Sequence, residues 1–580
     1  MSKVIVFATP VFLLLIALEL VWSRSRASRT AGQAVYRLND AINSISLGIL
    51  SQLGGVLSKL LTVGIYTAVF GAVALFPRVE FWNTWYGLLL AVLFYDLCYY
   101  WNHRGGHRVA VLWAAHVVHH QSQHYNLSTA LRQTSSGALF GWIFYLPMAL
   151  AGVPPLVFGI AALIDLLYQF WVHTEQVGKL GWFDRVFCSP SNHRVHHAVN
   201  APYIDRNYGG ILVVWDRLFG SFQEERDQEP CVYGTRGALN SWDPLWANAE
   251  VYWALAQASW RTRRWGDKLR VWLKPPGWQP ADLAQAAPYP AFRLDAVTTY
   301  DPPLGPVQKG FAVLQFGLAL VGVAVFLWHA DQMPLGEVAL WVAALATALW
   351  GLGLFMQGRL ALLEVLVLES AILTTLGALD LLPGRLLFKP LTMVIAMVFV
   401  AARAYSTRAS AGFSINFERL LLAALLFSLG GDVFLMLPGD YFVPGLASFL
   451  VAHLFYIALF RQGQAWFPSR RALAAVLGVG ALMYAVVWGG LGNPVLKAAV
   501  AAYVTVISLM AAQALGRATV QGDAGARWVA VGACIFMLSD ALIAINKFVT
   551  PVPLSGLWVL ATYYAAQMLI VHHARPGTRA

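Results

Sequence analysis

Long apolar runs are the feature that most constrains this sequence. Several of them approach 20 residues, the length that an α-helix needs to cross the apolar core of a bilayer. Hydrophobic residues make up 58% of the 580 positions and charged residues only 12%, which is far from the composition of a soluble domain. The sequence therefore predicts an all-α, polytopic, integral membrane protein.

The first apolar run covers residues 4–22. Arg24, Arg26 and Arg29 follow it without a small-residue cleavage pattern, so we expect a retained anchor. The net charge of +11 comes from Arg and Lys scattered over short loops, which is typical of cytoplasmic loops and argues against nucleic acid as a partner. The four cysteines share no spacing typical of a metal site or a disulfide scaffold.

The apolar runs fall into two blocks. The first block continues through 41–76, 85–101, and a hairpin of 134–151 and 156–172 that turns at Gly152-Val153-Pro154-Pro155. The second block holds runs at 310–328, 336–355, 360–382, 388–402, 416–437, 443–460, 472–489, 494–513, 528–546 and 555–571. Between the blocks, the polar and Pro-rich residues 198–308 predict a cytoplasmic cap followed by a linker.

Ten of the fourteen histidines lie between His103 and His197. Eight of them form three spaced groups: His103 and His107; His116, His119 and His120; and His193, His196 and His197. His124 and His173 stand alone. Residues three or four apart share a helix face, so each group can present its imidazoles together. A bound metal would relieve the crowding of so many basic side chains, and the sequence predicts metal binding.

The ligand type and number narrow the choice of metal. Imidazole suits zinc, copper, nickel and iron, and zinc sites usually close with four ligands. Eight or more histidines fit two metals, and the Glu-x-x-His pairs of carboxylate-bridged di-iron bundles are missing from the sequence. Two irons that activate dioxygen for attack on a lipid C–H bond fit this pattern, with a zinc hydrolase as the competing interpretation.

The expected membrane topology predicts on which side of the membrane the histidines lie. The Arg-bearing loop 23–40 predicts that the first run ends in the cytoplasm. Counting the later runs from there puts all three histidine groups on the cytoplasmic side, just beyond the ends of their helices. In the second block, alternate loops again carry arginines.

The order HxxxH, HxxHH, HxxHH resembles the fatty acid hydroxylase/sterol desaturase superfamily, and within it the sequence is closest to the alkylglycerol monooxygenase family. The matching stretches are YRLNDAINSISLG (36–48), YYWNHRGGH (99–107), LWAAHVVHHQSQHYNLSTALRQ (112–133), HTEQVGKLGWFD (173–184) and SPSNHRVHHAVNAPYIDRNYGGILVVWDRLFGSF (189–222). The resemblance implies a histidine-bound di-iron centre that hydroxylates the ether-linked carbon of a glyceryl ether and releases a fatty aldehyde. It implies dioxygen and a tetrahydropterin or another electron donor, including an electron-donor protein, as partners.

The same resemblance bears on residues around the three groups. The resemblance implies His173 as a ninth ligand or a neighbour of one. Asp96 and Asp165 lie two turns before His103 and His173 and are candidates for orienting ligands, and Asn192 beside the last group is a further candidate. Relatives often carry an acidic residue after the second group, where this chain has Gln123-His124. If that carboxylate holds the metal or the reductant, Gln123 acts differently or His124 replaces it.

The second block carries ionisable residues inside apolar runs, where burial in lipid is costly and function is a common reason for it. Asp432, His453 and Asp540 are examples, in stretches that resemble the YhhN-like lysoplasmalogenase family over residues 360–573. That family cleaves the vinyl ether bond of lysoplasmalogens, which needs a proton on carbon and a water on the resulting cation. We expect Asp432 and Asp540 to be the acid/water pair, with His453 nearby.

These predictions divide the chain into a di-iron domain at 1–230 with its histidine core at 90–222, a cap and linker at 231–308, connecting helices at 309–359, and the lysoplasmalogenase-like bundle at 360–573. Three alternatives stay open. The first is a fatty acid or sterol hydroxylase or desaturase, and the second is a zinc-dependent or purely hydrolytic lipid enzyme. The third makes the C-terminal bundle a lipid-binding or transport module.

Overall fold

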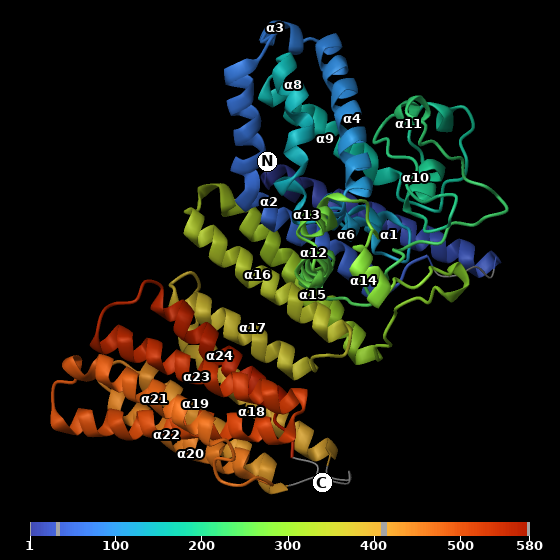
Figure 1. The fold of residues 1–580 in the computed structure, drawn as a ribbon. Coiled ribbons are helices and arrows are strands. Elements are labelled where there is room, and N and C mark those ends of the chain that lie inside the picture. Colours follow the sequence, from blue (N-terminus) through green and yellow to red (C-terminus); the bar gives the residue numbers. More distant parts are fainter. Residues whose placement is uncertain (1, 31–34, 408–414, 577–580) are drawn as a thin grey trace. The chain divides into compact units, whose positions relative to one another are not determined.

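The computed structural model describes residues 2–30, 35–407 and 415–576, and every regular element in those ranges is a helix (Figure 1). Two isolated bridges, Phe187 with Leu212 and Ala198 with Tyr233, are the β-type pairings among these residues. The chain divides into two compact units, residues 1–359 and 360–580. The prediction of an all-helical protein is confirmed.

The first unit contains the histidine-rich region. Its helices are α1 (Ser2–Thr30), α2 (Leu38–Val73), α3 (Val79–Trp82), α4 (Trp85–Arg108), α5 (Ala110–Ala114), α6 (Val117–His120), α7 (Leu127–Ala130), α8 (Leu146–Ala151), α9 (Pro155–Trp171), α10 (Pro190–His197), α11 (Val214–Leu218), α12 (Pro244–Arg261), α13 (Trp265–Leu273), α14 (Ala281–Ala286), α15 (Pro306–His329) and α16 (Leu335–Met356).

The second unit is a bundle of long helices. They are α17 (Leu362–Ala378), α18 (Arg385–Thr407), α19 (Ile415–Met436), α20 (Phe442–Arg461), α21 (Arg470–Val487), α22 (Pro494–Gln521), α23 (Ala524–Phe548) and α24 (Ser555–His573). Neighbours in sequence pack against each other, as α19 with α20 and α23 with α24 do. Its core contains large side chains from several helices, including Phe417, Tyr456, Phe460 and Phe536.

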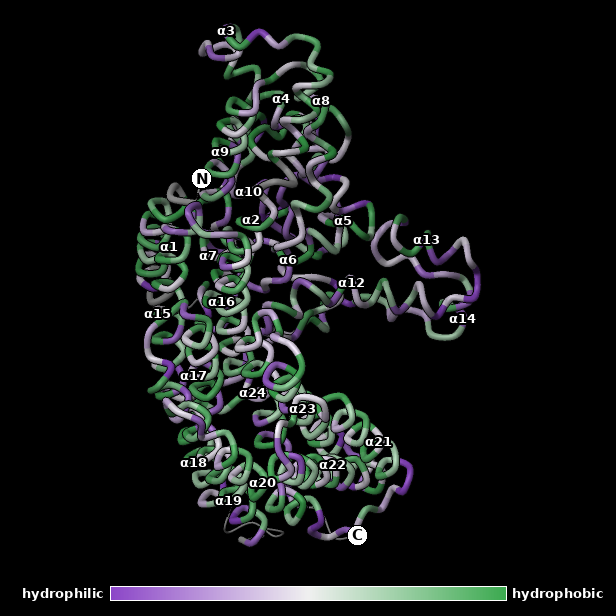
Figure 2. Tube along the Cα trace, turned by 90° about the vertical axis from the view of Figure 1, so that its left-hand side faces the viewer, coloured by the Kyte–Doolittle hydropathy of each residue, from purple (hydrophilic) through white to green (hydrophobic). Residues whose placement is uncertain are grey.

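Ten helices of the described residues are long and apolar enough to cross a membrane. These segments are Ile5–Ser25, Leu38–Ser58, Pro306–Gln332, Leu335–Met356, Arg385–Ser406, Asn416–Met436, Phe442–Arg461, Arg470–Gly490, Pro494–Gln521 and Ala524–Phe548. Figure 2 shows hydrophobic residues along the helices of both units and hydrophilic ones near α13 and α14. The chain is a multi-pass membrane protein.

The first arm of the expected hairpin differs from the prediction. Residues 134–151 do not form one apolar helix: two short 3₁₀ helices, Gly137–Leu139 and Gly141–Tyr145, lead into the six-residue α8. The two glycines weaken a helix, and Pro147 fits only the first turn of α8. The second arm, α9, is continuous and packs against α4.

Two apolar clusters hold the first unit together. One joins α1, α2, α15 and α16 through residues such as Leu53, Phe326 and Leu349. The other joins α2, α4, α8 and α9 through Ala91, Met148 and their neighbours. α4 therefore packs against other helices along its apolar part, while its C-terminal end carries His103 and His107 away from that packing.

Candidate functional site

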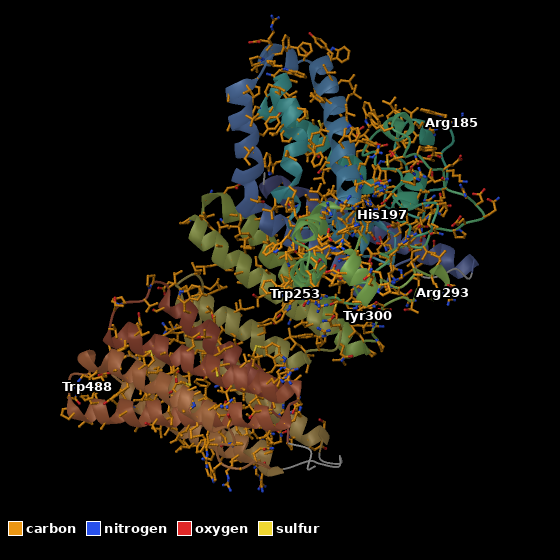
Figure 3. All side chains as sticks on the ribbon, viewed as in Figure 1. Arg185, His197, Trp253, Arg293, Tyr300 and Trp488 are labelled. Atoms are coloured by element: carbon orange, nitrogen blue, oxygen red, sulfur yellow. The ribbon has the colours of Figure 1, made fainter. Side chains whose placement is uncertain are left out.

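Four short stretches of the first unit bring nine histidines together. His103 and His107 lie one turn apart near the end of α4, whose N-terminus is capped by the Thr84 hydroxyl. The HVVHH group lies at α6, and the HRVHH group ends α10, where Ser189 caps the helix and Pro190 starts it. His173 follows the end of α9. Figure 3 marks His197 in this region.

The nine histidines form two sets of ligand atoms, each set lying within 4.8 Å of one another. The first set has five histidines: His103, His107, His116, His120 and His196. The second has four: His119, His173, His193 and His197. Eight of the nine side chains are buried and His116 is partly exposed. His124 belongs to neither set.

Backbone carbonyls fix the ring orientation of four of the nine histidines. The Nδ1 atom of His103 lies 2.8 Å from the oxygen of Tyr208, and that of His119 lies 2.9 Å from the oxygen of Arg132. His173 and His196 make the same contact, at 2.8 and 2.9 Å, with the oxygens of Gln169 and Arg206. A carbonyl oxygen only accepts, so each Nδ1 carries the hydrogen and each Nε2 keeps a lone pair.

The Nε2 atoms of these histidines lie close to one another or have no hydrogen-bond partner among the described residues. In the four-histidine set, the Nε2 atom of His173 lies 3.2 Å from that of His119 and 3.1 Å from that of His193. In the other set, the Nε2 atoms of His103, His107 and His196 are buried and have no hydrogen-bond partner among the described residues. Buried lone pairs that face one another call for a shared cation.

The electrostatics of the site fit the same chemistry. Burial lowers the pKa of His103 to about 3 and that of His119 to about 4. It lowers the pKa of the other seven well below the ordinary value, with mutual repulsion among the imidazoles adding to the effect. The imidazoles are therefore neutral near pH 7, as metal ligation requires. Sets of five and four imidazole donors fit iron, which the nine residues can hold.

The loop that follows α10, residues 208–215, is held by two buried carboxylates and contacts His103. The Asp96 carboxylate accepts hydrogen bonds from the amides of Ile211 and Leu212, at 2.7 and 3.0 Å, and from the Trp215 indole at 2.8 Å. Asp216 holds the amides of Tyr208 and Gly209 at 2.7 and 2.8 Å. The same loop supplies the Tyr208 carbonyl that His103 contacts, so Asp96 acts on the histidine through the loop.

Gly210 lets this loop approach two buried acids. A Cβ atom at Gly210 would lie 2.6 Å from Oδ1 of Asp165 and 3.0 Å from Oδ1 of Asp96. Asp165 also accepts a hydrogen bond of 2.6 Å from the Gln169 side chain, and the carbonyl of Gln169 contacts His173. Asp165 is therefore connected to a histidine of the four-histidine set through one intervening residue.

Asn192 and the Gln123-His124 pair contact backbone and not the ligand atoms. The Asn192 amide donates to the carbonyls of Asp184 and Phe187, at 2.9 and 3.2 Å. Gln123 donates to the Thr298 carbonyl at 2.9 Å and accepts from the Tyr300 amide at 2.8 Å. Gln123 thus fastens the segment that precedes α15 to the histidine region.

Some residues near the ligands had no individual prediction. Asp205 has a carboxylate oxygen 3.7 Å from Nδ1 of His107, and Arg132 carries the carbonyl that orients His119. Both lie inside matching stretches of sequence, but Arg and Asp in turns are common, and spacing along the chain does not distinguish these two. Tyr208 acts through its main chain, which leaves no side-chain signal.

In the second unit, Asp432 lies in a buried ion pair. Its Oδ1 atom is 3.3 Å from Nζ of Lys389, and its Oδ2 atom accepts a hydrogen bond of 2.6 Å from Tyr563. The three residues come from α19, α18 and α24. Lys389 was visible in the sequence beside Pro390, whereas a tyrosine in an apolar helix gives no comparable signal.

Asp540 and His453 meet at a second tyrosine. Tyr503 donates a hydrogen bond to Oδ2 of Asp540, and its oxygen lies 3.0 Å from Nε2 of His453. Nε2 of His453 is 3.6 Å from the same carboxylate. Asp540 and Tyr503 line a cavity of about 770 Å³ whose other walls are mainly apolar, such as Phe449, Met483 and Ile507.

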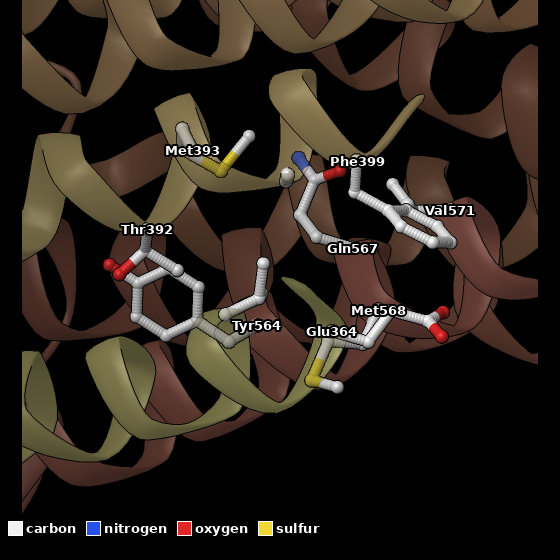
Figure 4. A pocket seen from close by; sticks show the side chains of 10 residues that line it. Glu364, Thr392, Met393, Phe399, Tyr564, Gln567, Met568 and Val571 are labelled. Carbon is white, nitrogen blue, oxygen red and sulfur yellow. The ribbon is translucent and has the colours of Figure 1, made fainter. Parts of the chain in front are cut away.

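A different cavity of about 370 Å³ lies between α17, α18 and α24 (Figure 4). Its polar groups come from Glu364, Thr392, Tyr564 and Gln567, and Met393 and Phe399 supply apolar walls. None of Asp432, His453 and Asp540 lines it. Of these three candidates, Asp540 lines the larger cavity, and Asp432 and His453 line neither of the two.

The comparison with protein families divides the chain in the same way. The family described as fatty acid hydroxylase matches residues 88–221, and the YhhN family matches residues 384–574. No solved structure matches the chain.

The individual relatives include alkylglycerol monooxygenases and a lysoplasmalogenase. The alkylglycerol monooxygenase of Danio rerio is 37% identical over 378 residues, which are 64% of this chain and 81% of that protein. The Homo sapiens protein of the same name is 40% identical over 275 residues, 47% of this chain and 59% of that protein. The lysoplasmalogenase TMEM86A of Homo sapiens is 36% identical over 159 residues, 26% of this chain and 62% of that protein.

Proposed function

The chain belongs to the alkylglycerol monooxygenase family, and on that premise we propose that its first unit holds two irons and oxidises the ether-linked carbon of alkylglycerols. The protein is an iron-dependent lipid monooxygenase of the membrane. The division of nine histidines into a set of five and a set of four supports the number of two irons. Each set supplies enough nitrogen donors for one ion.

The overall reaction consumes dioxygen and two reducing equivalents. One oxygen atom enters the C–H bond next to the ether oxygen and the other leaves as water, with two electrons and two protons from the donor. The product is a hemiacetal, which breaks its C–O bond to give a fatty aldehyde and glycerol. Bound iron supplies the activation of dioxygen for this step.

The chain's own residues prepare the site for that chemistry. The carbonyls of Tyr208, Arg132, Gln169 and Arg206 hold four imidazoles in one tautomer with Nε2 facing inward. Burial keeps the imidazoles neutral and excludes water from their lone pairs. A tetrahydropterin is the proposed electron donor, which oxidises to a dihydropterin as it supplies two electrons and two protons.

Turnover measurements on the purified protein test this function. With alkylglycerol, dioxygen and tetrahydropterin together, we expect fatty aldehyde at a rate that falls to background when any one of the three is left out. Metal analysis should find about two irons per chain. Aldehyde release without dioxygen from protein that contains only zinc would contradict the oxygenase and favour a hydrolase. Equal turnover of a free fatty acid or a sterol would shift the substrate assignment.

For the second unit we propose vinyl ether hydrolysis of lysolipids. The supporting observation is that Asp540 and Tyr503 line the larger of the two cavities described above for that unit, and that His453 contacts Tyr503. A carboxylic acid in such a site can protonate the vinyl carbon, and Asp540 is the acid that lines this cavity. Asp432, the expected second acid, does not line it and lies beside Lys389 and Tyr563. The products would be a fatty aldehyde and the glycerol head-group part of the lipid without a hydrocarbon chain, so both units would release aldehydes from ether lipids. A bundle that binds lysoplasmalogen but releases no aldehyde would be a lipid-binding module instead.

We also propose that the histidine sets face the cytoplasm, and that the four regions 1–230, 231–308, 309–359 and 360–573 are the functional segments of the chain. Arg24, Arg26 and Arg29 after the first span support this orientation. A protease site inserted between Pro276 and Pro306 should be cut in inside-out vesicles and protected in right-side-out vesicles. The reverse pattern would contradict the orientation.

A further inference from the structure

The first membrane-spanning helix carries a buried acid to which the roles described so far give no function. Glu19 lies in the span Ile5–Ser25 of α1 and is only 7% exposed. An ionisable side chain inside a span is costly in lipid, and function is a common reason for it. A helix that served only to anchor the chain in the bilayer would need no carboxylate at this position.

Three donors from three different segments meet the Glu19 carboxylate. The Tyr36 hydroxyl, just before α2, donates to Oε2. The main-chain amide of Leu127, at the start of α7, donates to the same oxygen at 2.8 Å. The Thr174 hydroxyl donates to Oε1. Because α1 also packs against α7, Glu19 joins the first helix to segments that lie about 100 and 150 positions further along the chain.

Two of these segments hold histidines of the four-histidine set. Thr174 directly follows His173 in the chain. Leu127 begins the short helix that leads to Arg132, whose carbonyl oxygen accepts the hydrogen bond from Nδ1 of His119. The carboxylate of α1 is therefore connected to the backbone of one histidine and to the carbonyl that orients another.

A buried arginine holds the main chain of the same segment. Arg194, next to His193 on α10, donates from Nη1 to the Thr174 carbonyl at 3.0 Å. Its Nε and Nη2 atoms donate to the Glu225 carboxylate, at 2.9 and 2.7 Å. The hydroxyl of Thr174 is bonded to Glu19 and its carbonyl to Arg194, so this residue has little freedom to move.

The network around Thr174 fixes two histidines that would share one ion. The Nε2 atoms of His173 and His193 lie 3.1 Å apart. The Gln169 carbonyl sets the rotation of the His173 ring. The position of the His173 backbone depends also on the residue that follows it, and that residue is held by α1 and α10.

The five-histidine set is oriented by other residues. The carbonyls of Tyr208 and Arg206 accept from Nδ1 of His103 and His196. Among the described residues, neither carbonyl belongs to a segment that Glu19 contacts. Loss of the Glu19 carboxylate should therefore weaken one set and spare the other.

We propose that Glu19 is a positioning residue of the four-histidine set, which makes the first membrane-spanning helix part of the metal site. Glu19 acts on His173 through the Thr174 hydroxyl and on His119 through α7. The inference rests on the proposed function, because it concerns how one of the two proposed irons is held. Removing a partner that lies behind a metal ligand typically weakens metal binding about 10–100-fold.

Competition for ferrous iron between the full-length protein and a chelator, without dioxygen, tests the inference one set at a time. His103→Ala/His107→Ala leaves the five-histidine set with three ligands, so the four-histidine set is measured in this protein. His173→Ala leaves the four-histidine set with three, so the five-histidine set is measured there. Adding Glu19→Ala should raise the iron Kd about 10–100-fold in the first protein and leave it unchanged in the second.

Variants of Thr174 test the proposed link without altering the spanning helix. In the protein that reports the four-histidine set, Thr174→Val replaces the hydroxyl by a methyl group and should also raise the iron Kd. Thr174→Ser keeps the hydroxyl and should bind iron like the parent. Glu80→Ala removes an exposed acid of the same unit and should change neither Kd. The Thr174 variants carry the test if Glu19→Ala does not fold.

The outcomes separate this inference from the proposed function. An equal rise of the iron Kd in both sets would make Glu19 a general structural residue and overturn the inference, and an unchanged Kd in both would overturn it too. A parental Kd in Thr174→Val also overturns it, because the hydroxyl is the proposed link. If the variants behave as expected but the parent does not oxidise alkylglycerol, the inference stands and the proposed substrate fails. If the parent binds no iron, both fail.

Discussion

The Nε2 atoms of His173 and His193 lie 3.1 Å apart, although twenty residues separate the two histidines along the chain. His173 donates its Nδ1 hydrogen to the Gln169 carbonyl, so its Nε2 cannot donate to His193. A cation bound by both nitrogens stabilises such a pair. His173 is therefore the histidine whose removal best tests the metal centre.

His173→Ala should lower bound iron from about two to about one per chain, because the four-histidine set keeps three ligands and loses affinity. Metal analysis of the purified variant measures this, and oxygen-dependent aldehyde release should fall with it. His124→Ala is the matched control, since His124 belongs to neither set and should keep both irons. Equal loss of iron in the two variants would contradict the division into sets.

Gly210→Ala should destabilise the first unit by about 1–3 kcal/mol through overpacking. The new methyl group would meet the Asp165 and Asp96 carboxylates at 2.6 and 3.0 Å and push the loop away from His103. The temperature of thermal unfolding and the iron content should both fall. At Gly178 a methyl group meets no atom within 4 Å, so Gly178→Ala should match the parent. A stable Gly210→Ala protein with full iron would show that the loop has room to move.

Asp540→Asn should reduce vinyl ether hydrolysis at least about 100-fold, the usual contribution of a general acid or base. Tyr503→Phe should also reduce it, by removing the hydrogen bond to the same carboxylate. Oxygenase activity with alkylglycerol should stay at the parental value, because neither residue lies in the first unit. Aldehyde release from a lysoplasmalogen measures the first effect. The exposed Asp440→Asn variant controls for the charge change within the same unit.

Lys389→Met should destabilise the second unit by about 3–5 kcal/mol, because it leaves the buried Asp432 carboxylate without its cation. Calorimetric unfolding of the full chain reports the change. Adding Asp432→Asn in the same protein should restore part of the lost stability, since no buried charge then remains unpaired. The loss of unfolding free energy in the double variant should be smaller than the sum of the losses in the two single variants. If it equals that sum, the two residues are not coupled and the expectation fails.

The sequence predicted most helices of this protein because lipid-length apolar runs have a strong periodic and compositional signal. The exception, residues 134–151, contains Gly137, Gly141 and Pro147, and these interrupt a helix that hydrophobicity alone would favour. The nine candidate ligands were also visible as residues. Their division was not, because His119 and His120 are adjacent and belong to different sets, as do His196 and His197. Successive helical residues point about 100° apart, so two adjacent histidines of one helix reach different sets.

Contacts between residues far apart in the sequence could not be predicted from the sequence alone. Tyr503 and Tyr563 resemble any other tyrosine in an apolar helix until folding brings Asp540 and Asp432 to them. Asn43 and Trp242 are 199 positions apart, and the Asn43 side chain donates a hydrogen bond of 2.7 Å to the Trp242 carbonyl. Such pairs depend on tertiary packing, which a single sequence does not encode in its spacing.

The unequal sizes of the two histidine sets have a consequence for metal fidelity. A closed set of four imidazoles is also what zinc prefers, whereas a set of five exceeds its usual coordination. Zinc should therefore compete for the set that contains His173 and much less for the set that contains His103. In a zinc-rich cell the protein would be mis-metallated at one position only, and it would lose its oxygenase activity while its metal stoichiometry still appeared complete.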